Sequence, residues 1–324
     1  MPGRSRPENH DMPDKPKALH TAFVLLLPVV VAAFGFSAWT ALLLVLLAVL
    51  WRWSMVLHGL VRPAAGPDLV LETISASHFV EKVRWSMDRL GLDYEEAPCG
   101  GTLGAFYLGR TVPRLHFRTG AVRSQIGNSP EILRYLWGAY GTTRGAAAAF
   151  LEPTAERLEF ESRIDRAGVS LQVWAYYHLL DAPELCKHAW GADSDAVPAW
   201  QRALIGALFP LQAFMMRRAF RITEANYRKS RDRIDAMLAE TEAMLADGRT
   251  SILGGDTINY TDLAFAAIQG VWLQPPVYGG GAGIRIERDR VPPAMRRDIE
   301  RWIEDYPAAT RFIETLYANE RKED

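Results

Sequence analysis

Three short groups of residues stand where the chain is expected to pass from one element to the next. Ser77 follows an expected strand at 69–74 and precedes an expected helix, and the other two groups are Val112-Pro113 and Asn128-Ser129. A serine hydroxyl can donate a hydrogen bond to an anion, and the positive end of a helix can stabilise the same anion. These residues could therefore stabilise a bound anion at the junctions between the elements.

Ser77 and its neighbour His78 each have a second interpretation. Ser77 can be the N-cap of the helix that follows, with Glu81 in the first turn, and one serine can fill both roles. His78 can act as a general base, or it can be a packing or solvated residue in the first turn. The residue types alone leave these alternatives open.

The elements around these residues form a small α/β unit. Val80, Val83, Met87 and Leu90 recur at helical spacing, and Gly91 stands where a helix C′ residue belongs. Short strands are expected at 69–74, 92–96, 114–117 and 121–123, and Asn128-Ser129-Pro130 is expected to cap a further helix.

This order of elements, with these residues, resembles the thioredoxin-like N-terminal domain of soluble glutathione transferases. Residues 77–85 look like the family's catalytic turn entering its first helix. Thr111-Val112-Pro113 is similar to the family's Val-Pro turn, in which the proline is cis. Asn128-Ser129 stands where the family usually has Glu-Ser or Gln-Ser before a helix.

The second half of the chain extends the resemblance. Its period is almost entirely helical after Pro153, with an apolar stripe over 234–245 that ends at Gly248. Asn259 and Asp262 predict a capping box like that of the family's helical domain. The resemblance implies an α/β thioredoxin-like domain at 68–141, followed by an all-α domain at 150–318, which together form the glutathione transferase fold.

The resemblance also implies roles for the site residues. Ser77 would donate to the sulfur of glutathione, and Val112 before Pro113 would pair through its backbone with the cysteinyl part. Asn128 and Ser129 would hold the γ-glutamyl group, although Asn128 departs from the acidic residue or Gln often found there. Val80 occupies a position where some bacterial relatives carry Cys, so a covalent thiol role at that position is excluded.

The pocket for a second substrate has no motif. Residues 174–178 and 214–218 carry aromatic, Met and Arg side chains that could face it. Such stripes are equally typical of a helical core. Arg217 and Arg218 could bind an anionic substrate, or they could lie on a solvated helix face.

Composition narrows the class of protein. Lys and Arg number 37 and Asp and Glu 38, which gives a net charge of −1 and argues against nucleic acid as a partner. Hydrophobic residues make up 49% of the chain, enough for a sizeable core. The two cysteines, Cys99 and Cys186, form no Cys-x-x-Cys pair, and no metal signature is present.

The N-terminal region is unlike the rest. Residues 1–18 have the composition of a disordered tail, and 62–67 that of a compact linker. Residues 21–51 contain no charged residue and no histidine. We therefore predict a transmembrane segment at 19–61 in the lipid bilayer, either one span or a hairpin broken near Gly35. Basic residues on both flanks favour the hairpin, with both ends and the following domains in the cytoplasm.

Two functions of different class follow. The first is a membrane-anchored glutathione transferase that uses glutathione as co-substrate and conjugates or reduces small hydrophobic electrophiles in detoxification. The second is a non-catalytic module of the same fold that serves binding or assembly. The resemblance further implies a homodimer.

Overall fold

The computed structural model describes residues 38–61, 68–74, 76–100, 112–119, 122–280 and 283–321. The chain divides into two compact units, one of residues 1–66 with 118–123 and one of residues 67–117 with 124–324. The tail expected at 1–18 and the linker expected at 62–67 lie outside the described residues.

Helix α2 (Ala38–Val61) belongs to the first unit. In the described part of the chain, no helix combines the length and the apolar character needed to cross a bilayer. The predicted transmembrane segment at 19–61, and the membrane location derived from it, are therefore wrong. The uninterrupted apolar run of α2, between Thr40 and Arg52, is the eleven residues Ala41–Trp51. These make about 16.5 Å of helix, against a hydrocarbon thickness of about 30 Å. The first expected span, 20–34, lies outside the described residues.

A four-stranded mixed sheet opens the second unit. Its strands are β1 (Leu69–Thr73), β2 (Glu95–Pro98), β3 (Arg114–Thr119) and β4 (Val122–Gly127). They lie in the order β2-β1-β3-β4, with β1 parallel to β2 and antiparallel to β3. Val70 therefore faces Glu95 on one side and His116 on the other.

Helix α3 (His78–Arg89) connects the two parallel strands, because a parallel pair needs a crossover rather than a hairpin. Ser77 is its N-cap and accepts a hydrogen bond from the amide of Val80. Gly91 follows the helix with φ 63°, a left-handed conformation that glycine adopts without a Cβ clash. The predicted start and end of this helix are confirmed.

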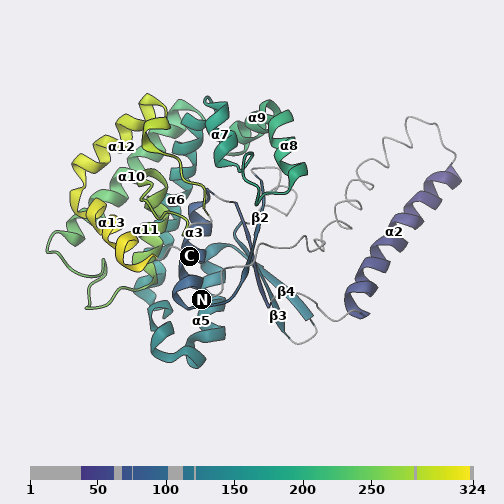
Figure 1. The fold of residues 1–324 in the computed structure, drawn as a ribbon, viewed down its shortest axis with the longest axis horizontal. Helices are drawn as coiled ribbons and strands as arrows, with labels where there is room; N and C mark the ends of the chain where they lie inside the picture. Colours follow the sequence, from purple (N-terminus) through teal and green to yellow (C-terminus); the bar gives the residue numbers. More distant parts are fainter. Residues whose placement is uncertain are drawn as a thin grey trace. The chain divides into compact units, whose positions relative to one another are not determined.

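The rest of the second unit is helical (Figure 1). Its elements are α5 (Ser129–Arg144), η1 (Gly145–Leu151), α6 (Ala155–Leu179), α7 (Pro183–Ala189), α8 (Ala199–Ala207), α9 (Phe209–Ala219), α10 (Glu224–Leu245), α11 (Tyr260–Leu273), η2 (Arg288–Arg290), α12 (Pro293–Asp305) and α13 (Pro307–Glu320). A mixed sheet followed by a helical bundle agrees with the fold class expected from the sequence.

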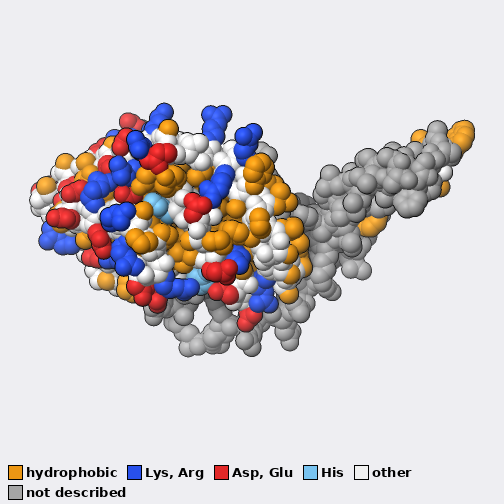
Figure 2. Space-filling model, turned by 90° about the horizontal axis from the view of Figure 1, so that it is seen from above, with side chains coloured by type: hydrophobic (Ala, Val, Ile, Leu, Met, Phe, Trp, Pro, Cys, Tyr) orange, Lys and Arg blue, Asp and Glu red, His pale blue; other side chains and the backbone are white. Residues whose placement is uncertain are grey.

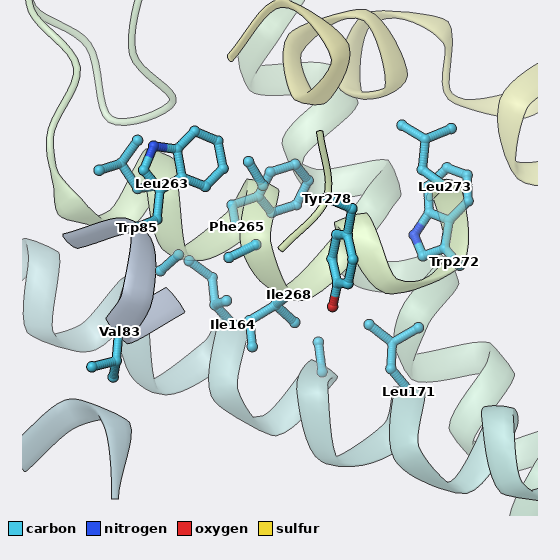
Figure 3. Packing of buried hydrophobic residues seen from close by; sticks show 14 of the residues in the cluster. Val83, Trp85, Ile164, Leu171, Leu263, Phe265, Ile268, Trp272, Leu273 and Tyr278 are labelled. Carbon is cyan, nitrogen blue, oxygen red and sulfur yellow. The ribbon is translucent and has the colours of Figure 1, made fainter. Parts of the chain in front are cut away.

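Helix α11 lies at the centre of the core, in contact with α3, α6 and α13. Figure 3 shows Trp85 of α3 and Ile164 of α6 together with buried side chains of α11, such as Leu263 and Ile268. Residues of α11 from Tyr260 to Gly270 are all buried, so this helix has no solvent face over its first eleven residues. Most of these residues are apolar, as expected of a helix buried on all sides, and the polar ones are Thr261, Asp262 and Gln269.

The surface carries charges of both signs. Figure 2 shows basic and acidic side chains interleaved around hydrophobic ones on one face. Exposed apolar side chains of α8, of α9 and of the residue between them are Trp200, Leu208, Leu211 and Phe214.

A buried capping box holds the start of α11, as the sequence predicts. The Asn259 side chain accepts from the Thr261 amide, and the fully buried Asp262 carboxylate accepts from the Asn259 amide at 2.8 Å. Asp262 also accepts from Ser251 Oγ and from the Ile252 amide, each at 2.8 Å. One carboxylate thus satisfies three donors that water cannot reach.

Replacing Asp262 with alanine is expected to lower the free energy of unfolding by about 3 kcal/mol, because it strands these three buried donors. Asp256→Ala, at an exposed position just before the box, is the matched control and should change it by less than about 0.5 kcal/mol. Denaturant titration of both variants measures the difference. Equal effects of the two substitutions would contradict a structural role for the box.

Candidate functional site

Ser77 lies at the junction of β1 and α3. Its amide donates to the Ile74 carbonyl at 2.9 Å, which closes the turn between strand and helix. Its Oγ accepts from the Val80 amide at 3.4 Å. A hydroxyl that accepts one hydrogen bond still has a proton to donate. The geometry therefore combines both interpretations of Ser77, a helix cap and a donor to a ligand.

Val112 and Pro113 are joined by a cis peptide bond. Both the amide and the carbonyl of Val112 are without a hydrogen-bond partner among the described residues. The Pro113 carbonyl accepts from the Asn128 amide at 3.2 Å. The second group of site residues is thereby attached to the third.

Asn128 and Ser129 stand at the start of α5. Asn128 is the N-cap of this helix and Pro130 lies in its first turn, as the sequence predicts, but Asn128 has φ 75° and an exposed side chain that makes no capping hydrogen bond. Ser129 is 1% exposed, and its Oγ has no partner among the described residues. A buried hydroxyl without a partner is uncommon and fits a position where a polar ligand completes the hydrogen bond.

A cavity of about 530 Å³ is lined in part by residues of the first two groups, Ser77 and Val112. Ser77, His78 and Val112 form one wall, whereas Pro113, Asn128 and Ser129 are not part of the lining. The rest of the lining comes mainly from helices and connections of the second half and is mostly apolar: Leu171, Ala175, Tyr176, Leu179, Ala189, Trp190, Met216, Ala219, Phe220, Val271, Trp272, Ile284, Ile286, Val291, Met295 and Ile299. Cavities of this size and lining are typical of small-molecule sites.

The helix segments suggested by the sequence contribute to this cavity only in part. Ala175, Tyr176 and Met216 line it. Trp174 instead packs in the core, where its Nε1 donates to Asp298 at 2.9 Å, and Phe214 is 61% exposed.

Arg217 and Arg218 lie outside the cavity lining as well. Arg217 forms an ion pair with Asp181 at 2.7 Å. Arg217 and Arg218 therefore do not form an anion site in this cavity.

Several residues that line the cavity could not be predicted from the sequence. Trp190, Phe220, Trp272 and Arg288 line it from four different elements or connections. Their spacing along the chain carries no signal, because the fold alone brings them together.

His78 is a packing residue. Its ring is 4% exposed, and Nε2 lies 3.0 Å from the Gly168 carbonyl of α6, in the geometry of a hydrogen bond donated by the ring. A Cβ at Gly168 would lie 2.9 Å from the Phe79 ring, so this glycine permits α3 to approach α6 closely. Burial lowers the pKa of His78 to about 4, against a smaller opposing effect of the Gly168 bond. The ring is thus neutral at neutral pH and too weak a base to take a proton from a thiol.

Neither cysteine offers a reactive thiol. Both are buried, and burial raises the pKa of Cys186 to about 12. Within the described residues, no three His, Cys, Asp or Glu side chains are grouped so that they could hold a metal ion.

Neither a known protein-family model nor a curated protein matches the chain. Among solved structures, it is similar to a glutathione S-transferase from Methylobacterium radiotolerans in complex with glutathione sulfonate. The identity is 16% over 78% of this chain and 91% of that one, with a TM-score of 0.47.

Two further similarities are to glutathione S-transferase III in its apo form and to a glutathione transferase from Phanerochaete chrysosporium in complex with oxidized glutathione. The first has 18% identity over 78% of this chain and 93% of that one, with a TM-score of 0.47. The second has 17% identity over 78% and 92%, with a TM-score of 0.43.

Replacing His78 with glutamine is expected to reduce the pH dependence of stability. Between about pH 6.5 and 4 the unfolded chain binds a proton at His78 and the folded chain does not, so the free energy of unfolding falls as the pH falls. Through His78, the free energy of unfolding of the wild type falls by about 3 kcal/mol as the pH falls from 6.5 to 4. Above pH 6.5 none of this stability is lost. Glutamine can keep a donor for the Gly168 carbonyl but does not titrate.

Denaturant unfolding at pH 7, 6, 5 and 4 measures this contribution. The control is His188→Gln, at a partly exposed ring that pairs with Asp193 at 2.7 Å; it should leave the decrease in place. The interpretation fails if His78→Gln and the wild type lose stability in parallel.

Proposed function

We propose that the chain binds glutathione along Ser77, Val112-Pro113 and Asn128-Ser129 and joins it, through its sulfur, to a small hydrophobic electrophile held in the cavity. The observation that carries this proposal is that Ser77 and Val112 share one wall of a largely apolar cavity of about 530 Å³. A donor for an anionic sulfur and a place for an apolar second substrate are thereby adjacent. One of the similar structures is a complex with glutathione sulfonate and another is a complex with oxidized glutathione.

The backbone groups of Val112 and the hydroxyl of Ser129, which would hold glutathione, have no hydrogen-bond partner among the described residues. The amide and carbonyl of Val112 would pair with the cysteinyl residue in the manner of a strand. Ser129 Oγ would donate to the γ-glutamyl carboxylate, with the positive end of the 16-residue helix α5 favouring the negative charge. The exposed Asn128 side chain would remain near the glutamyl amine without a fixed partner.

Ser77 would lower the pKa of the bound thiol. Its hydroxyl would donate to the sulfur, and the free amides at the start of α3 would add the helix dipole. Because His78 cannot serve as the base at neutral pH, the thiol proton would leave to solvent. The site would therefore hold a thiolate at rest and need no proton acceptor during the reaction.

In the reaction, the thiolate sulfur would attack an electrophilic carbon of the second substrate with its lone pair and form a carbon–sulfur bond. The bond from that carbon to its leaving group would break, and the leaving group would keep the electron pair. The apolar walls would exclude water, which strengthens the hydrogen bond from Ser77 to the sulfur.

The first test is the ultraviolet absorbance of the thiolate in glutathione bound to the full chain, followed across pH. We expect a bound thiol pKa about one to two units below that of a free thiol, and Ser77→Ala should raise it by about one unit. Affinity for glutathione should change less than about threefold, because other groups hold the tripeptide.

Thr154→Ala provides a matched control for that experiment. Thr154 is the N-cap of α6 and accepts from the Arg157 amide at 3.3 Å, so its loss also removes a hydroxyl cap, but away from the cavity lining. It should leave the thiol pKa unchanged. Binding of glutathione by the wild type with no shift in the thiol pKa would instead favour a non-catalytic binding module.

A second test concerns the γ-glutamyl end. Ser129→Ala is expected to weaken glutathione binding about tenfold, since it removes a hydrogen bond to a charged group. Ser124→Ala, at an exposed position of β4, should leave the affinity unchanged. Isothermal titration calorimetry with glutathione measures both, and equal affinities of the two variants would exclude Ser129 from the site.

A further inference from the structure

One formal charge stands on the cavity wall. Of the described residues that line the cavity, Arg288 is the one with a charge at neutral pH, because none of the others is Asp, Glu or Lys and His78 is neutral. An apolar cavity with a single cation at its lining is selective toward ligands that carry a negative group on an apolar body.

Arg288 is positioned but not neutralised. It begins η2 (Arg288–Arg290), and its Nη2 donates to the Leu273 carbonyl at the end of α11 at 3.2 Å. No carboxylate lies within ion-pair distance of it in the described part of the chain. Its side chain is exposed, so its guanidinium stays hydrated and charged at the edge of the cavity. The remaining N–H groups are available for a bidentate pair with a carboxylate or sulfonate.

Two neutral polar groups accompany it. Gln172 is half-buried and lines the cavity, and its amide makes no hydrogen bond with the described residues. Tyr176 Oη accepts from Trp190 Nε1 at 3.4 Å and keeps its own proton for donation. By contrast, the Gln274 amide is already used, since it donates to the Val271 carbonyl and accepts from the Ile286 amide.

Aromatic rings form much of the remaining wall. Tyr176 lies 5.7 Å from Phe220 and 6.3 Å from Trp190 between ring centroids, and Trp272 lines the same cavity. Their faces and edges suit a flat aromatic body.

We infer that the second substrate is an aromatic organic anion, whose carboxylate or sulfonate pairs with Arg288 while its apolar rings occupy the cavity. The electrophilic carbon of such a ligand would then face Ser77. For the reaction that follows binding, this inference rests on the proposed function. The binding itself does not require glutathione, so the two can fail separately.

The experiment compares two fluorescent probes that differ in one charged group. These are 1-anilinonaphthalene-8-sulfonate and the uncharged N-phenyl-1-naphthylamine, titrated into the full chain without glutathione. The variants are Arg288→Gln and, as a matched control, Arg285→Gln on the same connection. Arg285 is also exposed but does not line the cavity.

A cavity-filling variant identifies the signal that comes from this site. Ala175→Trp places a large ring in the cavity, and the fluorescence that it removes is assigned to cavity binding. If Ala175→Trp lowers the unfolding temperature, Ala219→Trp fills the same cavity from the exposed end of α9.

We expect Arg288→Gln to weaken cavity binding of the sulfonate probe about tenfold and that of the neutral probe by less than about twofold. Arg285→Gln should leave both unchanged. An equal loss of both probes, no loss of the sulfonate probe, or a sulfonate signal that survives both filling variants would each overturn the inference. A charge-dependent loss supports it whether or not glutathione binds, whereas a failure to bind glutathione overturns the proposed function alone.

Discussion

Every charge on helix α3 must be paired, because this helix is buried along most of its length. Lys82, which is fully buried, lies 2.7 Å from Glu161 and 2.9 Å from Asp165, both on α6. Arg84 pairs with Glu96 of β2 and with Glu81 one turn away. Removing one partner of such a pair leaves an uncompensated buried charge, at a cost of about 3–5 kcal/mol. The ion pairs therefore fix α3 against the sheet and against the helical half at the same time.

The same helix anchors the far end of the chain. Glu81 accepts from Arg321 Nε at 2.9 Å, and Arg321 also pairs with Asp88. The Trp85 ring, centred 4.6 Å from that of Tyr317, lies beside this contact. Because α3 is held on several sides, its first turn has a defined position, and so does Ser77 at its N-cap. A stabilised anion at that end depends on charges buried elsewhere along the helix.

The sequence was sufficient for features governed by local rules. The helix after Ser77 and the capping box at Asn259 follow from spacing and from hydrogen bonds between near neighbours, and both are present. The membrane prediction took the charge-free residues 21–51 as one long apolar stretch, whereas in the described residues helix α2 begins at Ala38 and Arg52 interrupts its apolar run. Arg288 could not be predicted as part of a site, since its place beside Trp272 depends on how α11 and the connection after it pack.

Burial gives the cavity its apolar character and also decides which groups can act there. It removes the charge of His78 at neutral pH, as the lowered pKa of about 4 shows. In the proposed reaction the sulfur anion would therefore be stabilised by groups that carry no titrating charge, namely the Ser77 hydroxyl and the amides at the start of α3. The Arg288 side chain is exposed, so in our proposal it would restrict ionic recognition of a second substrate to the edge of the cavity. Because solvent is excluded from the interior of the cavity, the donors within it are neutral, and the charged Arg288 stands only at its edge.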